Sequence, residues 1–504
     1  MVMIAETRKY QAFYTKSTPI VDYMVKKLNL KPTDKIFEPC GGDGVFIDAI
    51  VSDNEYANID ICELNDNAFE TLISKFSSYP TINIRQCDTL LDNDLIFNSG
   101  FGGVYDKIIA NPPYGAWQEL EKRTVLKKIY SDLYAKETYA LFLFRCIELL
   151  KDGGILSFII PDTYLNLHMH KAIRKHILTK TKILELALFP SSFFPGVNFG
   201  YANLSIITLQ KTNNLNDSLK NEFKVFNSFK TVEQLANINE NELKVFTFTQ
   251  KEILSNPDYA FLISDNAEIA LAINNSKPKV GDIANCVTGF YSGDDKTFLQ
   301  VNSPDLKNGK NYDLVEANSV NRDYENIPHI LDGIEGEKHF LPIVKGGNIK
   351  FLKPEGWFMN WGKEAVNHYK KDKKSRFQNP QYYFKYGIGV PMISSSSITA
   401  SLIENKLFDQ SIVGIFPKDK SLTFYLLAFF NSPTCNKLIR TINPSANNPA
   451  NYIKKIPFVL PTSEQLKHID NTVREIIDSI KKTGSYEGKS ETELNEIIKT
   501  IYGF

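Results

Sequence analysis

The chain has 504 residues, of which 43% are hydrophobic and 23% charged, and its formal net charge is zero. This length allows two or three domains, and the composition is ordinary for a globular protein. The sequence has no apolar run of about 18 residues and no signal peptide, so it predicts a cytoplasmic protein without a membrane segment. Its six cysteines include no C-x-x-C pair, which predicts reduced cysteines and no metal site.

Helices and strands alternate in the first part of the chain. Residues 17–30 predict a helix, with Ser17 or Thr18 as its cap and Pro19 in its first turn. Strands are predicted in "DKIFEP", "NIDICELN", "INIRQCDTL", "YDKIIANPPY" and "ILSFIIP", and helices after "CGGDG", in "AFETLISKF" and in "YALFLFRCIELL". Because these strands are apolar throughout, they predict a parallel sheet covered on both faces, which is a doubly wound α/β domain. Ligands of such a domain bind at the carboxyl ends of its strands.

The pattern changes towards the C-terminus. Residues 211–222, "KTNNLNDSLKNE", are polar and predict a surface loop or a linker. Beyond about residue 260 the predicted strands are short and irregular, which indicates a separate α+β domain. Thr462 and Gln465 form a T-x-x-Q capping box that opens a helical tail. We therefore expect three parts, residues 1–250, 251–460 and 461–504.

Three acidic residues follow three consecutive predicted strands. Glu38 opens the stretch "EPCGGDG", Glu63 ends the second strand and Asp88 follows the third. The glycine-rich turn lacks the lysine of a phosphate loop and the G-x-G-x-x-G spacing. An acid at this place suits a cationic ligand group, and an acid at the end of the next strand can bind a ribose diol. The three together fit S-adenosylmethionine, which carries an ammonium, a sulfonium and a ribose.

The fourth strand ends in "NPPY", residues 111–114, where two prolines forbid a helix and enforce a rigid turn. The side-chain carbonyl of Asn111 and the backbone carbonyl of Pro112 are suited to accept both hydrogens of a planar amine. Pro113 stiffens the turn, and Tyr114 offers a ring for stacking. Fixed dipoles of this kind stabilise charge that develops during a reaction. This turn is therefore predicted to hold the exocyclic amine of a base.

In order, the chain contains "AFYTKSTPIV", "FEPCGGDGVF", "CELN", "CDTL", "NPPY" and "GGILSFIIP". In this it resembles a gamma-class adenine-N6 DNA methyltransferase of the TaqI type, as found in bacterial restriction-modification systems. The resemblance covers about the first 210 residues and continues more loosely through "LPIVKGGNIKFL", "FFNSPTCNKLIR" and "IIKTIYGF". It implies a Rossmann-like methyltransferase domain in residues 1–250, a target recognition domain in residues 251–460 and a helical tail.

The resemblance also implies roles for individual residues. The target adenine would be held by residues 111–114 and by Phe194 in "FFPGVNFGYA", with Phe193 as the competing aromatic residue. The implied cofactor site comprises Tyr14, Thr15, Glu38, Cys40, Gly42, Glu63, Asp88, Asn111 and Phe142.

Positive charge is concentrated in the predicted recognition domain. Residues 341–460 carry 17 Lys and Arg against 6 Asp and Glu, whereas residues 1–120 carry 10 against 17. Lysines in such a region bind phosphates, and asparagine can pair with adenine in the major groove. The segment "NPSANNPANYIKKIP" is unusually rich in asparagine. The predicted DNA contacts are Lys345, Asn348, Asn447, Asn448, Asn451, Lys454 and Lys455.

These observations predict a site-specific DNA adenine methyltransferase that flips its target base, since a base cannot be methylated inside the duplex. A monomer that binds double-stranded DNA in a prokaryotic cytoplasm is expected. Its restriction endonuclease would be a separate chain, or the enzyme would be a solitary methylase. Methylation of an RNA base, of a protein glutamine or of cytosine N4 stays open, as does an inactive DNA-binding specificity subunit.

Overall fold

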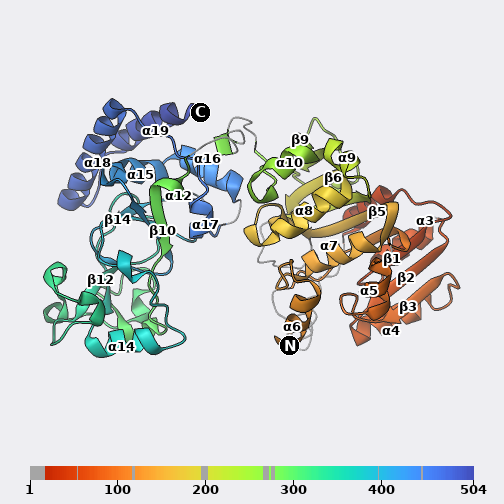
Figure 1. Cartoon of the computed structure of the whole chain (residues 1–504), viewed down its shortest axis with the longest axis horizontal. Helices are drawn as coiled ribbons and strands as arrows, with labels where there is room; N and C mark the ends of the chain where they lie inside the picture. The colour runs from red at the N-terminus through yellow and green to blue at the C-terminus, as the bar shows by residue number, and fades with distance from the viewer. Residues whose placement is uncertain are drawn as a thin grey trace. The chain divides into compact units, whose positions relative to one another are not determined.

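The computed structural model describes residues 17–53, 55–100, 102–115, 120–194, 203–264, 269, 272–273, 278–394, 397–443 and 446–504. The chain forms two compact units, Met1–Ile263 and Ser264–Phe504. Each unit has its own sheets and its own buried core, as the colour sequence in Figure 1 makes visible. The proposed catalytic residues belong to the first unit, and the proposed DNA contacts belong to the second.

The first unit is built on a nine-stranded sheet with the order β3-β2-β1-β4-β5-β7-β6-β8-β9. The strands β1 to β5 pair in parallel, which confirms the predicted α/β arrangement for this part of the sheet. These strands are β1 (Lys35–Glu38), β2 (Asn58–Glu63), β3 (Ile82–Gln86), β4 (Tyr105–Ala110) and β5 (Leu150–Pro161).

The rest of this sheet is mixed, so the expectation of an all-parallel sheet was wrong. The strand β7 (Asn203–Lys211) lies antiparallel between β5 and β6 (Thr181–Pro190). The strand β8 (Glu222–Asn227) is parallel to β6 and antiparallel to β9 (Lys244–Thr249). The physical reason is that β6 and β7 form a hairpin, and a hairpin necessarily inserts one antiparallel strand into a parallel sheet.

Helices cover the sheet of the first unit. The helix α2 (Thr18–Leu28) packs against β4, β5 and β7, whereas α7 (Thr138–Leu149) packs against β5 and α8 (Lys171–Lys180) against β6. In Figure 1, α7 and α8 lie in front of the sheet. In the described part of this unit, the remaining α-helices are α3 (Val45–Asp53), α4 (Asp66–Phe76), α5 (Asn93–Ser99), α6 (Leu120–Ile129), α9 (Leu215–Lys220) and α10 (Gln250–Ser255).

The helix α9 lies where the polar segment 211–222 predicts a loop or a linker, so that prediction was wrong. Asn214 caps this helix, because its side chain accepts a hydrogen bond from the backbone N–H of Asn216 at 3.0 Å. Ser218 is fully buried on its inner side. A helix is recognised in a sequence by apolar residues that recur every three or four positions. This short helix has one buried position and many polar residues, so it shows no such pattern.

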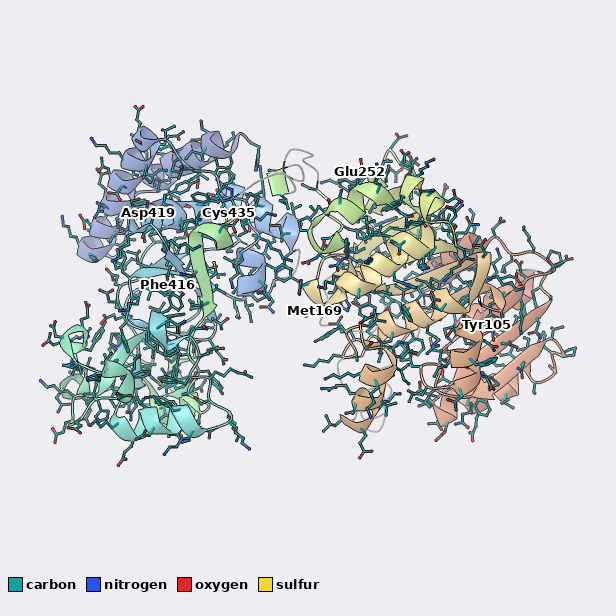
Figure 2. All side chains as sticks on the ribbon, in the orientation of Figure 1. Tyr105, Met169, Glu252, Phe416, Asp419 and Cys435 are labelled. Atoms are coloured by element: carbon teal, nitrogen blue, oxygen red, sulfur yellow. The ribbon has the colours of Figure 1, made fainter. Side chains whose placement is uncertain are left out.

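The core of the first unit explains why the ends of the strands are well positioned. Ile108 and Ile109 of β4 are fully buried. Tyr105, labelled in Figure 2, lies at the start of the same strand. It stacks on Phe37 of β1 with 4.6 Å between ring centroids, and its hydroxyl donates to Asp60 of β2 at 3.0 Å. These contacts of Tyr105 hold β4 in a fixed position relative to β1 and β2, and thereby help to position the carboxyl ends of the three strands.

The second unit contains two four-stranded sheets. Their orders are β10-β17-β14-β15 and β11-β13-β12-β16. The strands of the first of these sheets are β10 (Ala284–Thr288), β17 (Ile412–Pro417), β14 (Gly387–Pro391) and β15 (Ser401–Ile403). Those of the other are β11 (Leu299–Val301), β13 (Trp357–Asn360), β12 (Phe340–Val344) and β16 (Leu407–Phe408). These small sheets and the helices beside them agree with an α+β domain.

Helices complete the second unit towards the C-terminus. The buried helix α15 (Thr423–Phe430) packs against α16 (Pro433–Ile442), α18 (Ser463–Thr483) and α19 (Gly488–Tyr502). The predicted capping box is confirmed, since the backbone N–H of Gln465 donates to Thr462 Oγ1 at 3.2 Å and Gln465 Oε1 accepts from the N–H of Thr462 at 2.9 Å. The tail helices therefore belong to the same compact unit as the small sheets. Its shorter helices are α12 (Val280–Ile283), α13 (Asp295–Phe298), α14 (Lys363–Lys371) and α17 (Ala450–Ile453).

Candidate functional site

Three of the predicted site residues of the first unit lie at the carboxyl edge of the parallel strands. Glu38 ends β1, Glu63 ends β2 and Asn111 follows β4 directly. The register places Glu38 opposite Ile61 and Ala110 opposite Phe158. In parallel α/β sheets this edge is where ligands bind.

The turn after β1 requires glycine at two positions. A Cβ atom on Gly41 would lie 2.6 Å from Ile61 Cγ2, and one on Gly44 would lie 2.5 Å from a ring carbon of Phe76. Gly44 also has φ of +81°, a conformation that other residues rarely adopt. Close packing and backbone conformation therefore explain these glycines, and they bring the turn down onto the strand end.

Glu63 holds this turn in place. One of its carboxylate oxygens accepts a hydrogen bond from the backbone N–H of Gly42 at 2.7 Å. The other accepts from the backbone N–H groups of Leu64 at 2.8 Å and Asn65 at 2.7 Å. A carboxylate oxygen has two lone pairs, so acceptor capacity is left for a further donor such as a ribose hydroxyl.

Glu38 is a buried acid, with 2% of its surface exposed. Among the residues that the structure describes, its Oε2 has no hydrogen-bond partner. Burial, followed by the negative charges of Glu63, Asp43 and Asp48, raises the pKa of Glu38 well above its ordinary value. A buried acid surrounded by acids is costly unless a cation joins it. The site therefore fits a ligand with an ammonium or sulfonium group, as in S-adenosylmethionine.

The NPPY turn touches the glycine-rich turn. The thiol of Cys40 lies 3.5 Å from the backbone oxygen of Asn111 as a weak donor. Burial, and to a lesser degree the negative charges of Glu38 and Glu63, raise the pKa of this thiol well above its ordinary value. The thiol therefore stays protonated and can donate. Thr138, at the start of α7, donates its hydroxyl to the carbonyl of Pro113 at 2.6 Å. The turn is thus fixed from both sides.

Exposure differs among the residues that are proposed to hold the target base. Asn111 is half-buried, whereas Tyr114 is 1% exposed and Phe194 is 2% exposed. Phe193 is half-buried and stacks on Phe189 with 6.0 Å between ring centroids. Phe142 of α7 is 6% exposed. The predicted roles of these aromatic residues remain predictions, and Tyr14 and Thr15 lie outside the described residues.

Asp88 forms an ion pair that the sequence did not indicate. Its Oδ2 lies 2.5 Å from Nζ of Lys122 in α6, and its Oδ1 accepts from the backbone N–H of Leu90 at 3.1 Å. An adenine amine would have to share this carboxylate with Lys122. The role predicted for Asp88 therefore involves competition with an internal cation.

Sequence reasoning missed Asp162, which directly follows β5 at the same edge of the sheet. Its Oδ2 accepts a hydrogen bond from Nδ2 of Asn203, the first residue of β7, at 3.2 Å. Burial raises the pKa of Asp162 to about 6, although this hydrogen bond acts in the opposite direction. The signal was an acid directly after a predicted strand, the same signal that identified Glu38 and Glu63.

In the second unit two of the residues predicted to contact DNA have partners within the fold. Nζ of Lys345 lies 2.7 Å from Asp295 and 3.3 Å from Asp409, and its side chain is 18% exposed. Burial would lower the pKa of Lys345, but the two carboxylates outweigh it and raise that pKa. Asn448 is fully buried, and its backbone N–H donates to the carbonyl of Met392 at 2.6 Å. Both side chains thus make contacts inside the unit, and their contacts with DNA stay predictions.

The other predicted DNA contacts are accessible. Asn348, Asn447, Asn451 and Lys454 are exposed, and Lys455 is half-buried with its ammonium 5.6 Å from the ring centroid of Tyr452. Their contacts with DNA stay predictions.

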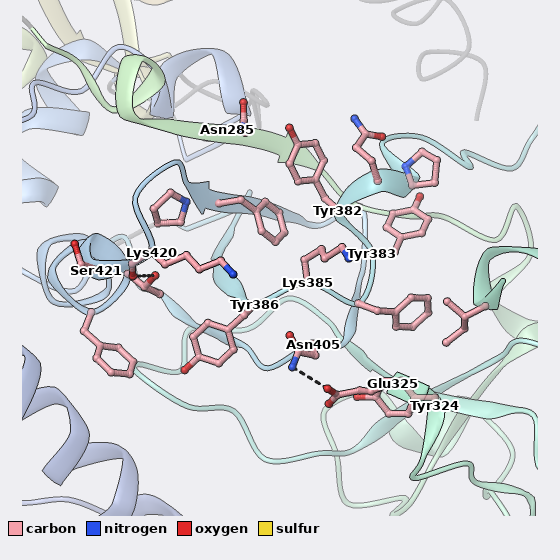
Figure 3. Close-up of a pocket in the computed structure, with 18 of the residues that line it drawn as sticks. Asn285, Tyr324, Glu325, Tyr382, Tyr383, Lys385, Tyr386, Asn405, Lys420 and Ser421 are labelled. Atoms are coloured by element: carbon pink, nitrogen blue, oxygen red, sulfur yellow. Dashed lines mark hydrogen bonds between the residues drawn. The ribbon is translucent and has the colours of Figure 1, made fainter. Parts of the chain in front are cut away.

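A groove of about 980 Å³ lies wholly within the second unit (Figure 3). Tyrosines line much of it, and Asn405 donates to Glu325 across it at 3.0 Å. It contains none of the predicted cofactor residues, which all lie in the first unit. Among the described helices, none is both long and apolar enough for a membrane crossing.

Comparisons with known proteins agree with this site. Residues 24–194 match the family model described as Eco57I restriction-modification methylase. Over 257 residues the chain is 27% identical to the type II methyltransferase M.AccI of Acinetobacter calcoaceticus, covering 50% of this chain and 45% of M.AccI. It is 20% identical over 416 residues to the adenine-specific methyltransferase PglX of Lacticaseibacillus casei, covering 79% of this chain and 33% of PglX.

The fold of the whole chain is also known. The restriction-modification enzyme MmeI, solved in complex with DNA, superimposes with a TM-score of 0.59 at 13% identity, covering 100% of this chain and 73% of MmeI. The chain spans less than half the length of M.AccI and a third of that of PglX. The matched segment, 24–194, contains the glycine-rich turn, the acids at the strand ends and the NPPY turn. Through this segment, the chain is similar to the restriction-modification methylases that the Eco57I family model describes.

Proposed function

We propose that the chain is a site-specific DNA adenine-N6 methyltransferase that uses S-adenosylmethionine. The observation that carries this proposal is the contact between the glycine-rich turn and the NPPY turn, where Cys40 Sγ meets the backbone oxygen of Asn111 at 3.5 Å. This contact supports a site for a cation beside a site for a planar amine. Transfer of a methyl group from a sulfonium to an amine needs both sites to be adjacent.

The cofactor supplies an electrophilic methyl group when it is bound. Glu38, with its orphaned buried oxygen, would hold the cationic methionine end. Glu63, whose oxygens already order the glycine turn, would accept from the ribose hydroxyls. The remaining contacts would be made by Cys40, Gly42, Asp88, Asn111 and Phe142, together with Tyr14 and Thr15.

The chain's own contribution to the chemistry is to position the amine. The side-chain carbonyl of Asn111 and the backbone carbonyl of Pro112 accept its two hydrogens, which draws its lone pair out of conjugation. Pro113 is held by the hydroxyl of Thr138 at 2.6 Å, so these acceptors need little reorganisation during the reaction. Tyr114 and Phe194 provide aromatic surface for the flipped base.

The substrate follows from the second unit. Flipping a base costs a few kcal/mol, which stacking and backbone contacts offset. The exposed Lys454 and the half-buried Lys455 follow the exposed Asn447 and Asn451 closely in the chain, which fits contacts to phosphates and base edges of double-stranded DNA. We propose a monomer that acts in the prokaryotic cytoplasm, either with a separate restriction endonuclease or as a solitary methylase.

The test is to express the chain in a host whose DNA is not methylated and to sequence that DNA with detection of modified bases. N6-methyladenine at one recurring sequence is expected, and Asn111→Ala should abolish it. Purified protein that binds S-adenosylmethionine yet leaves DNA unmodified would contradict the proposal. It would favour methylation of an RNA base or a protein glutamine, or a specificity subunit without activity.

A further inference from the structure

Ile393 is a large apolar side chain that the second unit leaves in solvent. Its side chain is 73% exposed, more than any other large apolar side chain among the described residues of that unit. Leu460 follows with 69% and Leu314 with 58%. A single exposed apolar residue is common and is not evidence of function. What distinguishes Ile393 is the way in which its backbone is fixed.

The backbone around Ile393 is held from several sides. Ile393 forms an antiparallel bridge with Asn447. On one side of it, the backbone N–H of Met392 donates to the carbonyl of Ser411 at 2.7 Å. On the other side, the N–H of Ser394 donates to the carbonyl of Ala446 at 2.8 Å, and the guanidinium of Arg440 donates to the carbonyl of Ser394 at 2.8 Å. An apolar side chain is therefore presented to solvent by a rigid backbone.

The surroundings of Ile393 are polar and suited to base edges. Asn447, its bridge partner, is exposed. The hydroxyl of Ser411, whose carbonyl binds Met392, accepts from the N–H of Gly346 at 3.1 Å, which ties in the loop that carries the exposed Asn348. Hydrogen bonds thus link three segments, residues 346–350, 391–394 and 446–448, into one connected region of the unit. It combines one prominent apolar side chain with exposed amides.

We propose that Ile393 reads thymine by packing against the C5 methyl group in the major groove, beside Asn447. Thymine is the only DNA base whose major-groove edge carries a methyl group, and apolar side chains contact it there. A branched side chain on a fixed backbone loses little conformational entropy when it binds. This inference rests on the proposed function. In that function the target adenine is paired with thymine, so every substrate duplex contains at least one thymine that Ile393 could contact.

The test compares thymine with deoxyuridine, which differs only in lacking the methyl group. Duplexes carry the sequence found in the methylation experiment, and each thymine is replaced in turn. For the wild-type protein we expect one replacement to lower kcat/KM about fourfold, the value of one buried methyl group. Ile393→Ala should show the lower rate on the thymine duplex and should not respond to that replacement. Leu460→Ala, an equally exposed apolar residue, should respond as the wild type does.

Two results would overturn the inference while leaving the proposed function intact. In one, no replacement affects the wild-type protein although the thymine duplex is methylated. In the other, Ile393→Ala responds to the same replacement as strongly as the wild type. A wild-type protein that methylates no duplex at all would contradict the proposed function itself, and the reading of thymine with it.

Discussion

The carboxylate of Glu63 accepts a hydrogen bond from the backbone N–H of Gly42 over 2.7 Å and thereby joins the end of β2 to the turn that follows β1. Its second oxygen accepts from two further backbone N–H groups. One acidic side chain therefore shapes the turn before any ligand is bound. Glu63, which we expect to contact the ribose, thus also stabilises the backbone of the site.

Glu63→Ala should weaken the binding of S-adenosylmethionine by about 10- to 100-fold, since each hydrogen bond to a charged group contributes about 1.5–3 kcal/mol. Isothermal titration calorimetry would measure this change. DNA affinity, measured by fluorescence anisotropy, should change less than about twofold, which is roughly the effect of an ordinary surface substitution. Glu70→Ala, which removes an exposed acid of the neighbouring helix α4, is the matched control. Equal loss of cofactor and DNA binding would indicate a structural role alone.

The binding of S-adenosylmethionine should also depend on pH through Glu38. Burial, followed by the neighbouring acids, raises the pKa of this carboxyl, so the ligand-free protein keeps it protonated to a higher pH than an ordinary glutamate. A cation favours the ionised form, and binding therefore releases a proton. Affinity should fall as pH is lowered through the raised pKa, by up to about tenfold per pH unit.

Calorimetry in two buffers of different ionisation enthalpy would detect that proton. Glu38→Gln has nearly the same shape and no charge to titrate, so it should bind more weakly and with little dependence on pH. If Glu38→Gln kept the pH dependence of the wild-type protein, another group would be responsible for it.

The parts of the site that are local in sequence could be predicted. The acids at the strand ends and the NPPY turn each lie within a few residues of a clear strand signal. The insertion of β7 between β5 and β6 could not be predicted in the same way, because the pairing of β7 with β5, which is distant in the chain, depends on the whole sheet. The internal partners of Lys345 and Asn448 could not be predicted for a related reason. A polar residue in a polar segment looks exposed, and only the fold reveals that Asp295 and Asp409 surround Lys345.

Asn111→Ala should reduce kcat by at least about 100-fold, the usual effect of removing one preorganised polar group from a reaction centre. The affinities for S-adenosylmethionine and for DNA should stay within about threefold of the wild type, because the turn is held through backbone atoms and Thr138. Single-turnover kinetics would separate the chemical step from binding. Near-normal single-turnover rates would show that the amine is held by other groups.

Lys345→Met should destabilise the second unit and leave DNA affinity unchanged. Removing the cation leaves Asp295 and Asp409 buried without it, and breaking a buried ion pair costs about 3–5 kcal/mol. Urea unfolding would measure the loss, and DNA binding would be measured at a temperature where the variant is folded. Lys371→Met, on the exposed surface of α14, should change stability by less than about 0.5 kcal/mol. A stable Lys345→Met variant with weakened DNA binding would support the original prediction of a phosphate contact.

Lys454→Ala tests the opposite case, an exposed lysine beside the asparagine-rich segment. If Lys454 binds a phosphate, its loss should weaken binding about equally for every DNA sequence and should lower the slope of log affinity against log salt by about one. Stability should be unaffected, because the side chain lies at the surface. Lys482→Ala, which removes an exposed lysine of α18, is the control for a general change in charge. An equal effect of both substitutions would mean that the positive charge of the whole unit attracts DNA, without a contact at Lys454.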